Sequence, residues 1–258
     1  MLEHLKKDVC EIAKRAQRDG LCKHKSGNFS ARDAKSGYIV ITPTSVDREM
    51  LTPRDMIVMD LDANVLEHAS GLRPTSEALM HLMIYRTRKD ARAIVHTHSM
   101  YGTTFALLNK PIPAIVYEVA NFGLTKARIP VAPYGRPGTM ELADSVVEVC
   151  KEAECFLLEK HGTVAFDTRD IYEAYLKANY IEELAQLYYN ALTVHQGKEQ
   201  GNSVCSGYIY ISLVRRPTHC RGKKKFSNES FKTRFIRFTL PKREAKPYCP
   251  LLLTGIIR

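Results

Sequence analysis

The feature that most restricts the fold is the order of strand-like and helix-like periodicities along the first 200 residues. Short β-type runs are expected at residues 37–45, 56–68, 91–99, 128–135 and 155–167, and helical spacing of apolar residues at 1–20, 73–90, 100–110, 139–153 and 170–196. Two of the β-type runs contain internal turns, around Asp62 and around Lys160–Gly162, and so predict hairpins. The elements do not follow a regular strand–helix–strand repeat. This order favours an α/β or α+β sandwich over a doubly wound parallel fold.

The helix expected at residues 73–90 is a capped one. Thr75 or Ser76 can serve as its N-cap, and Thr139 can open the helix at 139–153. The apolar stripe of the first helix is predicted to consist of Leu79, Met80, Met83 and Ile84. Glu77 would then lie in the first turn of that helix, where the helix dipole favours an acidic side chain.

The net charge of +10 is confined to one end of the chain. Residues 202–258 hold 13 of the 38 Lys and Arg residues and 2 of the 28 Asp and Glu residues, which leaves residues 1–201 with a net charge of −1. The prolines and scattered aromatics of this segment show no period. We therefore predict a domain of residues 1–201 and a basic, poorly ordered segment of residues 202–258. A neutral domain argues against a nucleic-acid partner, although Lys223–Lys225 in the basic segment could contact phosphates.

The cysteines and the apolar runs indicate the compartment. The seven cysteines are odd in number, irregularly spaced and without a CxxC pair, which argues against a disulfide framework or a cysteine zinc site. The first 20 residues read as an amphipathic helix rather than a secretory signal, and no run of about 18 apolar residues predicts a membrane span. The sequence predicts a protein of the reducing cytoplasm.

Two histidines give the first indication of a metal site. His96 and His98 are two residues apart in a predicted strand, so alternation places both imidazoles on one face. Two side chains at this spacing can converge on one metal ion, and His161, beside Gly162 in the predicted hairpin, is the best candidate for a third ligand. By itself, a His-x-His pair also fits two structural histidines.

Glu77 and two short turns form a second set of polar residues. The N-terminus of the helix behind Thr75 and Ser76 could bind a phosphate through its free N–H groups. The turns at Gly27–Ser30 and Thr42–Ser45 offer small hydroxyl and amide side chains that suit the same purpose. Each feature alone is more typical of ordinary capping or of an ordinary turn than of a phosphate site.

Taken together and in order, these pieces resemble the class II aldolase/adducin family, particularly its L-fuculose-phosphate aldolase branch. The matching segments are GNFSAR (27–32), ITPTS (41–45), PTSEALMH (74–81), AIVHTHS (93–99), LLNKPIPAIVYEV (107–119), IPVAPYGRPGTMELA (129–143) and LLEKHGTVAF (157–166). The resemblance covers about residues 1–197. Residues 202–258 match nothing in the family pattern, so Tyr208, Tyr210 and Tyr248 receive no catalytic role.

The resemblance implies a fold, an assembly and a site. The fold would be a three-layer α/β/α sandwich with a mostly antiparallel central sheet, and the assembly a homotetramer with sites at the subunit interfaces. His96, His98 and His161 would bind one Zn²⁺ per subunit, and Glu77 would be the catalytic acid/base and a further metal ligand in the absence of substrate. Tyr117 would reach into the site of a neighbouring subunit. The residues aligned with the phosphate-binding loops are Gly27, Asn28, Thr44, Ser45, Thr75 and Ser76.

The implied reaction is the cleavage of a ketose 1-phosphate, such as L-fuculose 1-phosphate, to dihydroxyacetone phosphate and an aldehyde. Breaking the C3–C4 bond leaves an enediolate whose charge must be stabilised, and a Lewis-acidic metal does this without a Schiff-base lysine. The alternative is a sugar-phosphate 4-epimerase or isomerase on the same scaffold. The epimerases carry an aspartate where this chain has Glu77, which favours the aldolase. The non-enzymatic cytoskeletal branch lacks the metal histidines, so their presence here favours an enzyme.

Overall fold

The computed structural model describes residues 1–69 and 71–196. The predicted boundary at Gly201 and the predicted basic segment 202–258 lie outside these residues. Five α-helices run over Glu3–Arg18 (α1), Ala78–Thr87 (α2), Met100–Leu107 (α3), Met140–Glu152 (α4) and Ile171–Gln196 (α5). Short 3₁₀ helices lie at Arg48–Met50 (η1), Pro53–Asp55 (η2) and Tyr117–Asn121 (η3).

The centre of the domain is an eight-stranded sheet with the order β4-β3-β2-β1-β5-β10-β9-β8. Its strands are Asn28–Arg32 (β1), Ile39–Ile41 (β2), Ile57–Met59 (β3), Val65–Glu67 (β4), Ala93–Thr97 (β5), Val131–Ala132 (β8), Cys155–Leu158 (β9) and Gly162–Asp167 (β10). All neighbours pair antiparallel except β8 and β9, which are parallel. A separate two-stranded sheet joins Ile112–Pro113 (β6) to Arg128–Ile129 (β7). The predicted hairpins at residues 56–68 and 155–167 are confirmed.

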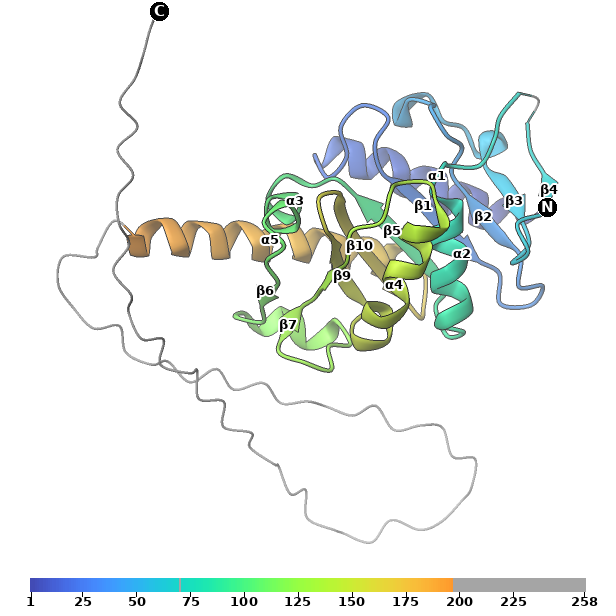
Figure 1. Ribbon diagram of the computed structural model, residues 1–258. Helices are drawn as coiled ribbons and strands as arrows, with labels where there is room; N and C mark the ends of the chain where they lie inside the picture. The colour runs from blue at the N-terminus through green and yellow to red at the C-terminus, as the bar shows by residue number, and fades with distance from the viewer. Residues whose placement is uncertain (70, 197–258) are drawn as a thin grey trace, which may run out of the picture. The chain divides into compact units, whose positions relative to one another are not determined.

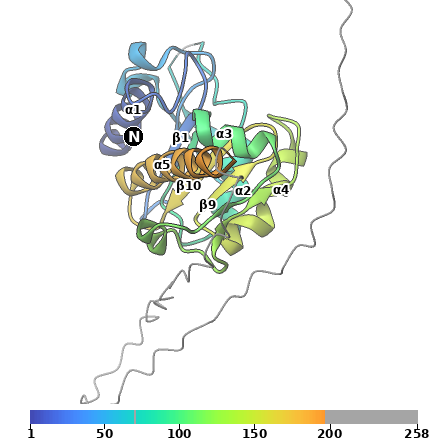
Figure 2. The same cartoon turned by 90° about the vertical axis from the view of Figure 1, so that its left-hand side faces the viewer.

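Helices cover both faces of the sheet, which confirms the three-layer sandwich (Figure 1). Helices α1, α3 and α5 pack on one face, as Figure 2 shows, and α2 and α4 pack side by side on the other. Every residue of the central strands β1, β5 and β10 is buried, because each strand is covered on both sides. Such strands lose the alternation of apolar and polar residues that marks a half-exposed sheet.

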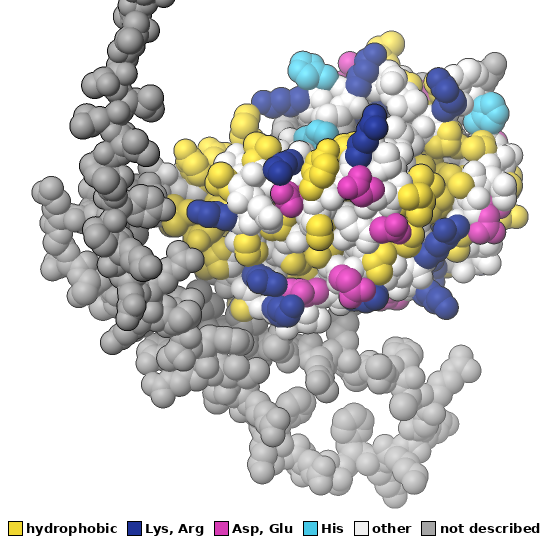
Figure 3. All heavy atoms as spheres, viewed as in Figure 1, with side chains coloured by type: hydrophobic (Ala, Val, Ile, Leu, Met, Phe, Trp, Pro, Cys, Tyr) yellow, Lys and Arg dark blue, Asp and Glu magenta, His cyan; other side chains and the backbone are white. Residues whose placement is uncertain are grey.

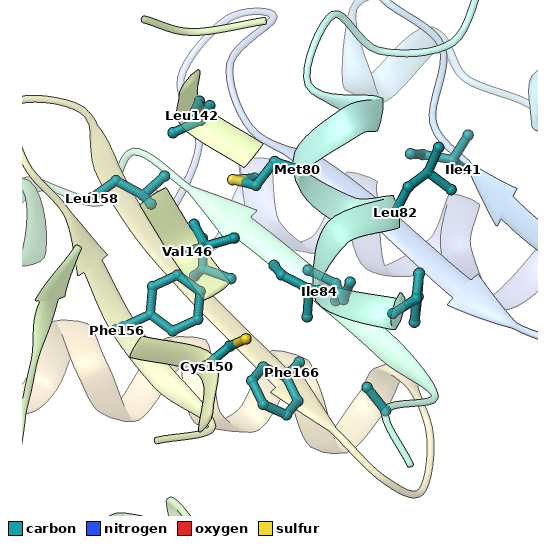
Figure 4. Packing of buried hydrophobic residues seen from close by; sticks show 14 of the residues in the cluster. Ile41, Met80, Leu82, Ile84, Leu142, Val146, Cys150, Phe156, Leu158 and Phe166 are labelled. Atoms are coloured by element: carbon teal, nitrogen blue, oxygen red, sulfur yellow. The ribbon is translucent and has the colours of Figure 1, made fainter. Parts of the chain in front are cut away.

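The apolar core beneath α2 and α4 fixes the position of both helices. Met80 and Ile84 of α2 meet Val146 of α4 and Phe156 and Phe166 of the sheet, and all five are at most 2% exposed (Figure 4). Burial of a side chain of this size contributes about 1.5–3 kcal/mol. Leu79 and Met83, which the sequence placed in the same stripe, are only partly buried. Figure 3 shows acidic and basic side chains interspersed over the visible surface.

The beginning of α2 differs from the prediction. The helix starts at Ala78, and its N-cap is Glu77, with φ −100° and ψ 18° and no side-chain cap bond, so the assignment of Thr75 or Ser76 as N-cap is wrong. Thr139, by contrast, is the N-cap of α4 as predicted. Within the described residues, no helix combines the length and the apolar character needed to cross a membrane.

Candidate active site

Three histidines meet because β5 and β10 are antiparallel neighbours. His96 lies at the end of β5 and pairs with Val164, and His98 follows the strand directly. His161 occupies the turn between β9 and β10, and the start of β10 lies beside the end of β5. The register of one strand pair therefore brings together residues that are about 65 positions apart in the sequence.

The three imidazoles form a compact cluster. Their ring centroids are 4.8–5.0 Å apart, and one ring nitrogen of each lies within 4.8 Å of the others. The Nε2 atoms of His96 and His98 are 3.0 Å apart. Two neutral imidazole lone pairs repel each other at this distance unless a proton or a cation lies between them.

The surroundings of the cluster fit a metal ion. The Nδ1 atom of His96 lies 2.9 Å from the carbonyl oxygen of Thr163, which can only accept, so Nδ1 carries the proton and Nε2 presents its lone pair to the cluster. Burial, with a smaller electrostatic contribution from the neighbouring His96 and His161, lowers the pKa of His98 to about 3, which keeps this imidazole in the neutral form that a metal binds. The donor set of three imidazoles suits Zn²⁺ and related divalent transition metals.

Glu77 completes the cluster from the opposite side. One carboxylate oxygen, Oε1, lies 2.9 Å from Nε2 of His161, and the other, Oε2, lies 3.1 Å from Nε2 of His96. Burial opposes ionisation of Glu77, but the adjacent His96 and His161 outweigh it and lower the pKa of the carboxyl below its usual range. The side chain of Glu77 points to the histidines and makes no cap hydrogen bond to α2, although Glu77 is the N-cap residue.

The three predicted polar turns converge beside Glu77. The backbone N–H of Phe29 donates to the hydroxyl of Thr42, and the N–H of Thr75 donates to the carbonyl of Thr42. A further backbone bond, 3.0 Å long, joins the N–H of Thr44 to Arg73. The turns that contain Gly27, Thr44, Ser45, Thr75 and Ser76 are therefore neighbours, although the sequence separates them by up to about 50 residues.

The side chain of Asn28, a predicted phosphate-binding residue, contacts Glu77 and His81. Its side-chain Nδ2 donates to Glu77 Oε2 at 2.8 Å, and its Oδ1 lies 2.6 Å from Nε2 of His81. The amide thus contacts the carboxylate within the site. Gly27 just before it adopts φ +75°, and a Cβ there would lie 2.3 Å from the sulfur of Cys22, so the position needs glycine.

Tyr117 lies apart from these residues, on η3, with 87% of its surface exposed. It makes no side-chain hydrogen bond among the described residues. The predicted role of Tyr117 in a neighbouring subunit's site stays a prediction.

The sequence reasoning missed four buried polar residues near the site. His81, Ser30 and Tyr85 form hydrogen bonds that lead to Asn28, and Arg48 binds the carbonyl groups of the turns. A signal for His81 and Tyr85 was present, because they follow Glu77 at intervals of four residues on the same helical face. No local pattern pointed to Arg48.

Comparison with known proteins agrees with this geometry. Residues 7–189 match the profile of the class II aldolase and adducin N-terminal domain. The chain is 33% identical over 198 residues to 5-deoxy-D-ribulose 1-phosphate aldolase of Bacillus thuringiensis, which covers 77% of this chain and 90% of the relative. It is 34% identical over 190 residues to L-fuculose phosphate aldolase of Escherichia coli K12, covering 74% and 85% of the two chains.

Solved structures show the same likeness. An L-fuculose 1-phosphate aldolase superposes with a TM-score of 0.70 at 32% identity, covering 74% of this chain and 87% of the other. L-fuculose-1-phosphate aldolase of Thermus thermophilus superposes with a TM-score of 0.64 at 27% identity, covering 78% and 98%. The chain therefore belongs to the class II aldolase and adducin family, in the branch of the L-fuculose-phosphate aldolases, and is an enzyme of the aldolase type.

Proposed function

We propose that this protein is a zinc-dependent aldolase that cleaves a ketose 1-phosphate, of the L-fuculose 1-phosphate type, to dihydroxyacetone phosphate and an aldehyde. The observation that carries the proposal is the meeting of Glu77 with His96, His98 and His161 beside three polar turns. His96, His98 and His161 would hold the metal, with Glu77 as a further ligand in the absence of substrate. A divalent metal bound there supplies a Lewis acid that stabilises the negative charge developing as the C3–C4 bond breaks.

Glu77 has the position and the charge for the proton transfer. Its carboxylate is buried and ionised beside the histidines, and it can remove the proton from the carbon next to the carbonyl of dihydroxyacetone phosphate. In the cleavage direction the same carboxyl group returns that proton to the enediolate carbon. Microscopic reversibility requires one group to serve both directions.

The phosphate group would be held by neutral donors. Gly27, Asn28, Thr44, Ser45, Thr75 and Ser76 lie on the three turns beside Glu77, and hydroxyl and N–H groups bind a phosphate without a salt bridge. The side chains of Ser45 and Ser76 are exposed and free to meet a ligand from solvent. Asn28, whose amide contacts Glu77, would assist the reacting end rather than the phosphate alone.

We further propose a cytoplasmic homotetramer in which Tyr117 acts on the substrate bound by a neighbouring subunit. The exposure of this tyrosine on a short 3₁₀ helix, away from its own chain's site, supports this arrangement. Its phenol could donate to the oxygen of the aldehyde.

The proposal is tested by product formation over a panel of ketose phosphates that includes L-fuculose 1-phosphate and 5-deoxy-D-ribulose 1-phosphate. We expect dihydroxyacetone phosphate from at least one, loss of activity with a chelator, and recovery with Zn²⁺. If no ketose 1-phosphate is cleaved, the proposal is wrong; conversion of a pentulose phosphate to its C4 epimer without cleavage would identify the epimerase instead.

The role of Glu77 is tested by Glu77→Gln, with Glu148→Gln as control because Glu148 is exposed on α4 and, in the part of the chain that the structure describes, pairs only with Lys151. We expect Glu77→Gln to lower kcat by about 10²–10⁴-fold and to abolish exchange of the C3 proton of dihydroxyacetone phosphate with D₂O. Glu148→Gln should leave both unchanged. Proton exchange that persists in Glu77→Gln would assign the base to another residue.

A further inference from the structure

Helix α2 and strand β1 face each other through a line of polar side chains, although the layer around them is apolar. Glu77, His81 and Tyr85 succeed each other at intervals of four residues along the helical face, and Asn28 and Ser30 are two apart on one face of the strand. We call these five residues the polar seam. It runs from the histidine cluster into the interior.

The hydrogen bonds of the polar seam form one continuous chain. Asn28 Nδ2 is 2.8 Å from Glu77, and Asn28 Oδ1 is 2.6 Å from His81 Nε2. On the other side of the imidazole, Ser30 Oγ is 2.7 Å from His81 Nδ1, and it is 2.9 Å from the hydroxyl of Tyr85.

The carboxylate of Glu77 stands at one end of this chain of hydrogen bonds and fixes the donor and acceptor of every bond in it. An ionised carboxylate only accepts, so Asn28 must turn its NH₂ group to Glu77 and its oxygen to His81. His81 must then carry its proton on Nε2 and accept on Nδ1 from the hydroxyl of Ser30. The oxygen of Ser30 accepts in turn from Tyr85. One arrangement of protons satisfies all five residues.

Because the polar seam is buried, breaking any of its hydrogen bonds would cost free energy. His81, Ser30 and Tyr85 are fully buried, and Asn28 and Glu77 are each 5% exposed. Burial lowers the pKa of His81 to about 3, so the imidazole is neutral at physiological pH and a single tautomer is meaningful. A buried donor or acceptor without its partner costs about 1–3 kcal/mol, so each member favours the orientation of the next.

We propose that His81 is a positioning residue for the proton transfer: as the Nε2–H tautomer it orients the amide of Asn28, which holds Oε2 of Glu77 and so fixes the carboxylate against the histidine cluster. This inference rests on the proposed function, because it assigns Glu77 the part of acid/base. His81 lies one helical turn beyond Glu77, and the hydrogen bonds of its side chain lead to the Glu77 carboxylate through Asn28.

The kinetic test compares two substitutions of His81. His81→Gln keeps a side-chain N–H near the place of Nε2, whereas His81→Leu removes it. We expect His81→Leu to lower kcat by about 10–10²-fold with KM and zinc content within twofold of wild type, since misplacing a reacting group by about 1 Å has effects of this size. His81→Gln should recover most of kcat. Ile84→Val, a buried neighbour on α2 outside the polar seam, should keep wild-type kcat.

A second measurement reads the tautomer directly. The ¹⁵N shifts of the His81 ring in the full-length, metal-free protein should show protonated Nε2 and unprotonated Nδ1. Ser30→Ala should weaken this preference for the Nε2–H tautomer. The same variant should reduce kcat less than His81→Leu does. Because Ser30→Ala removes one oxygen atom, it also covers the case in which His81→Leu does not fold.

The outcomes separate this inference from the proposed function. If the wild type cleaves no ketose phosphate, the proposed function is wrong and the tautomer measurement still decides the proton arrangement of the polar seam. If the wild type is active, the inference is overturned by a folded His81→Leu with wild-type kcat, by equal losses in His81→Leu and His81→Gln, or by a ring protonated on Nδ1.

Discussion

Gly162 is the residue on which the geometry of the histidine cluster depends most directly. A Cβ at this position would lie 2.5 Å from the carbonyl oxygen of Thr97, 3.0 Å from the ring of His98 and 3.2 Å from the ring of His96. In the turn predicted around Lys160–Gly162, the residue with left-handed backbone is Lys160, with φ +57°. Gly162 instead provides room for β10 to approach β5.

We therefore predict that Gly162→Ala displaces the ring of His98, lowers zinc affinity by at least about tenfold and costs about 1–3 kcal/mol of stability through overpacking. Titration calorimetry with Zn²⁺ and chemical denaturation measure the two effects. Gly37→Ala is the control, because a Cβ at Gly37 meets nothing within 4 Å and only its backbone is strained. The control should lose stability and retain zinc affinity; wild-type affinity in Gly162→Ala would contradict the steric argument.

At the scale of elements, the phosphate turns are held together by one buried guanidinium. Arg48, 2% exposed on η1, donates to the carbonyl oxygens of Lys25 and Gly27 in the first turn and to that of Val46 beside the second. No carboxylate pairs with Arg48 among the described residues. The neighbouring Asp47 offsets the charge of Arg48 without forming an ion pair, and a dianion bound at the proposed phosphate site would offset it further.

Arg48→Leu should raise KM for the sugar phosphate and weaken inhibition by inorganic phosphate by about tenfold or more, because both turns lose their common anchor and a nearby positive charge. Arg48→Lys should lie in between, since an ammonium group cannot reach three carbonyls with the geometry of a guanidinium. Steady-state kinetics with phosphate as competitor measures both variants. A folded Arg48→Leu with unchanged KM and phosphate inhibition would show that the turns hold their shape without it.

The elements also show which parts of the fold and of the site could be predicted from local sequence patterns. The hairpin at residues 155–167 and the start of α4 at Thr139 followed from local turn and cap chemistry. The run at residues 128–135 gave two strands, because β7 pairs with β6 and β8 pairs with β9. The histidine cluster was predictable from the family resemblance. The polar seam was not, because its bonds join residues 49 to 55 positions apart and require the position of α2 on β1.

At the scale of the whole molecule, a buried ion cluster attaches α5 to the sheet. Lys177 of α5 contacts the carboxylates of Glu154 and Asp167, and all three residues are at most 7% exposed. Burial opposes ionisation of Asp167, but hydrogen bonding to Lys177 outweighs it and lowers the pKa of Asp167 below its ordinary value of 3.8. The folded state thus binds this proton less readily than the unfolded chain does.

A carboxyl group whose pKa is lower in the folded protein than in the unfolded chain stabilises the fold at pH values above its unfolded-state pKa. This stabilisation is lost as the pH falls through the folded-state pKa. We predict that the unfolding free energy decreases below about pH 4 and that Asp167→Asn reduces this dependence on pH. Lys177→Met removes the buried cation that two carboxylates share and leaves Glu154 only its contact with Arg88 and Asp167 only its contact with Arg169, so it should cost roughly 3 kcal/mol at neutral pH. Urea unfolding from pH 3 to pH 7 measures these effects. Lys151→Met, which breaks an exposed pair with Glu148, should change little; a similar loss there would refute the argument from burial.

The proposed homotetramer leads to a prediction about sites that two neighbouring subunits form together. If Tyr117 acts on substrate bound by a neighbouring chain, Glu77→Gln and Tyr117→Phe damage different contributions to one shared site. Each variant alone should have low activity. When the two are unfolded together, mixed and refolded, sites that combine Glu77 from one chain with Tyr117 from the next become complete. Random mixing in equal amounts makes about a quarter of the sites complete, so the mixture should exceed both parents.

The control mixes Glu77→Gln with His161→Ala, both of which alter residues of the same chain's cluster. This mixture should stay as inactive as its parents, because no pairing of the two chains restores one complete set. Sedimentation of the refolded mixtures checks that subunits have exchanged and that the assembly contains four chains. Two results would mean that Tyr117 does not act across the interface. One is recovery of activity when Glu77→Gln is mixed with His161→Ala. The other is no recovery of activity in mixed tetramers of Glu77→Gln and Tyr117→Phe.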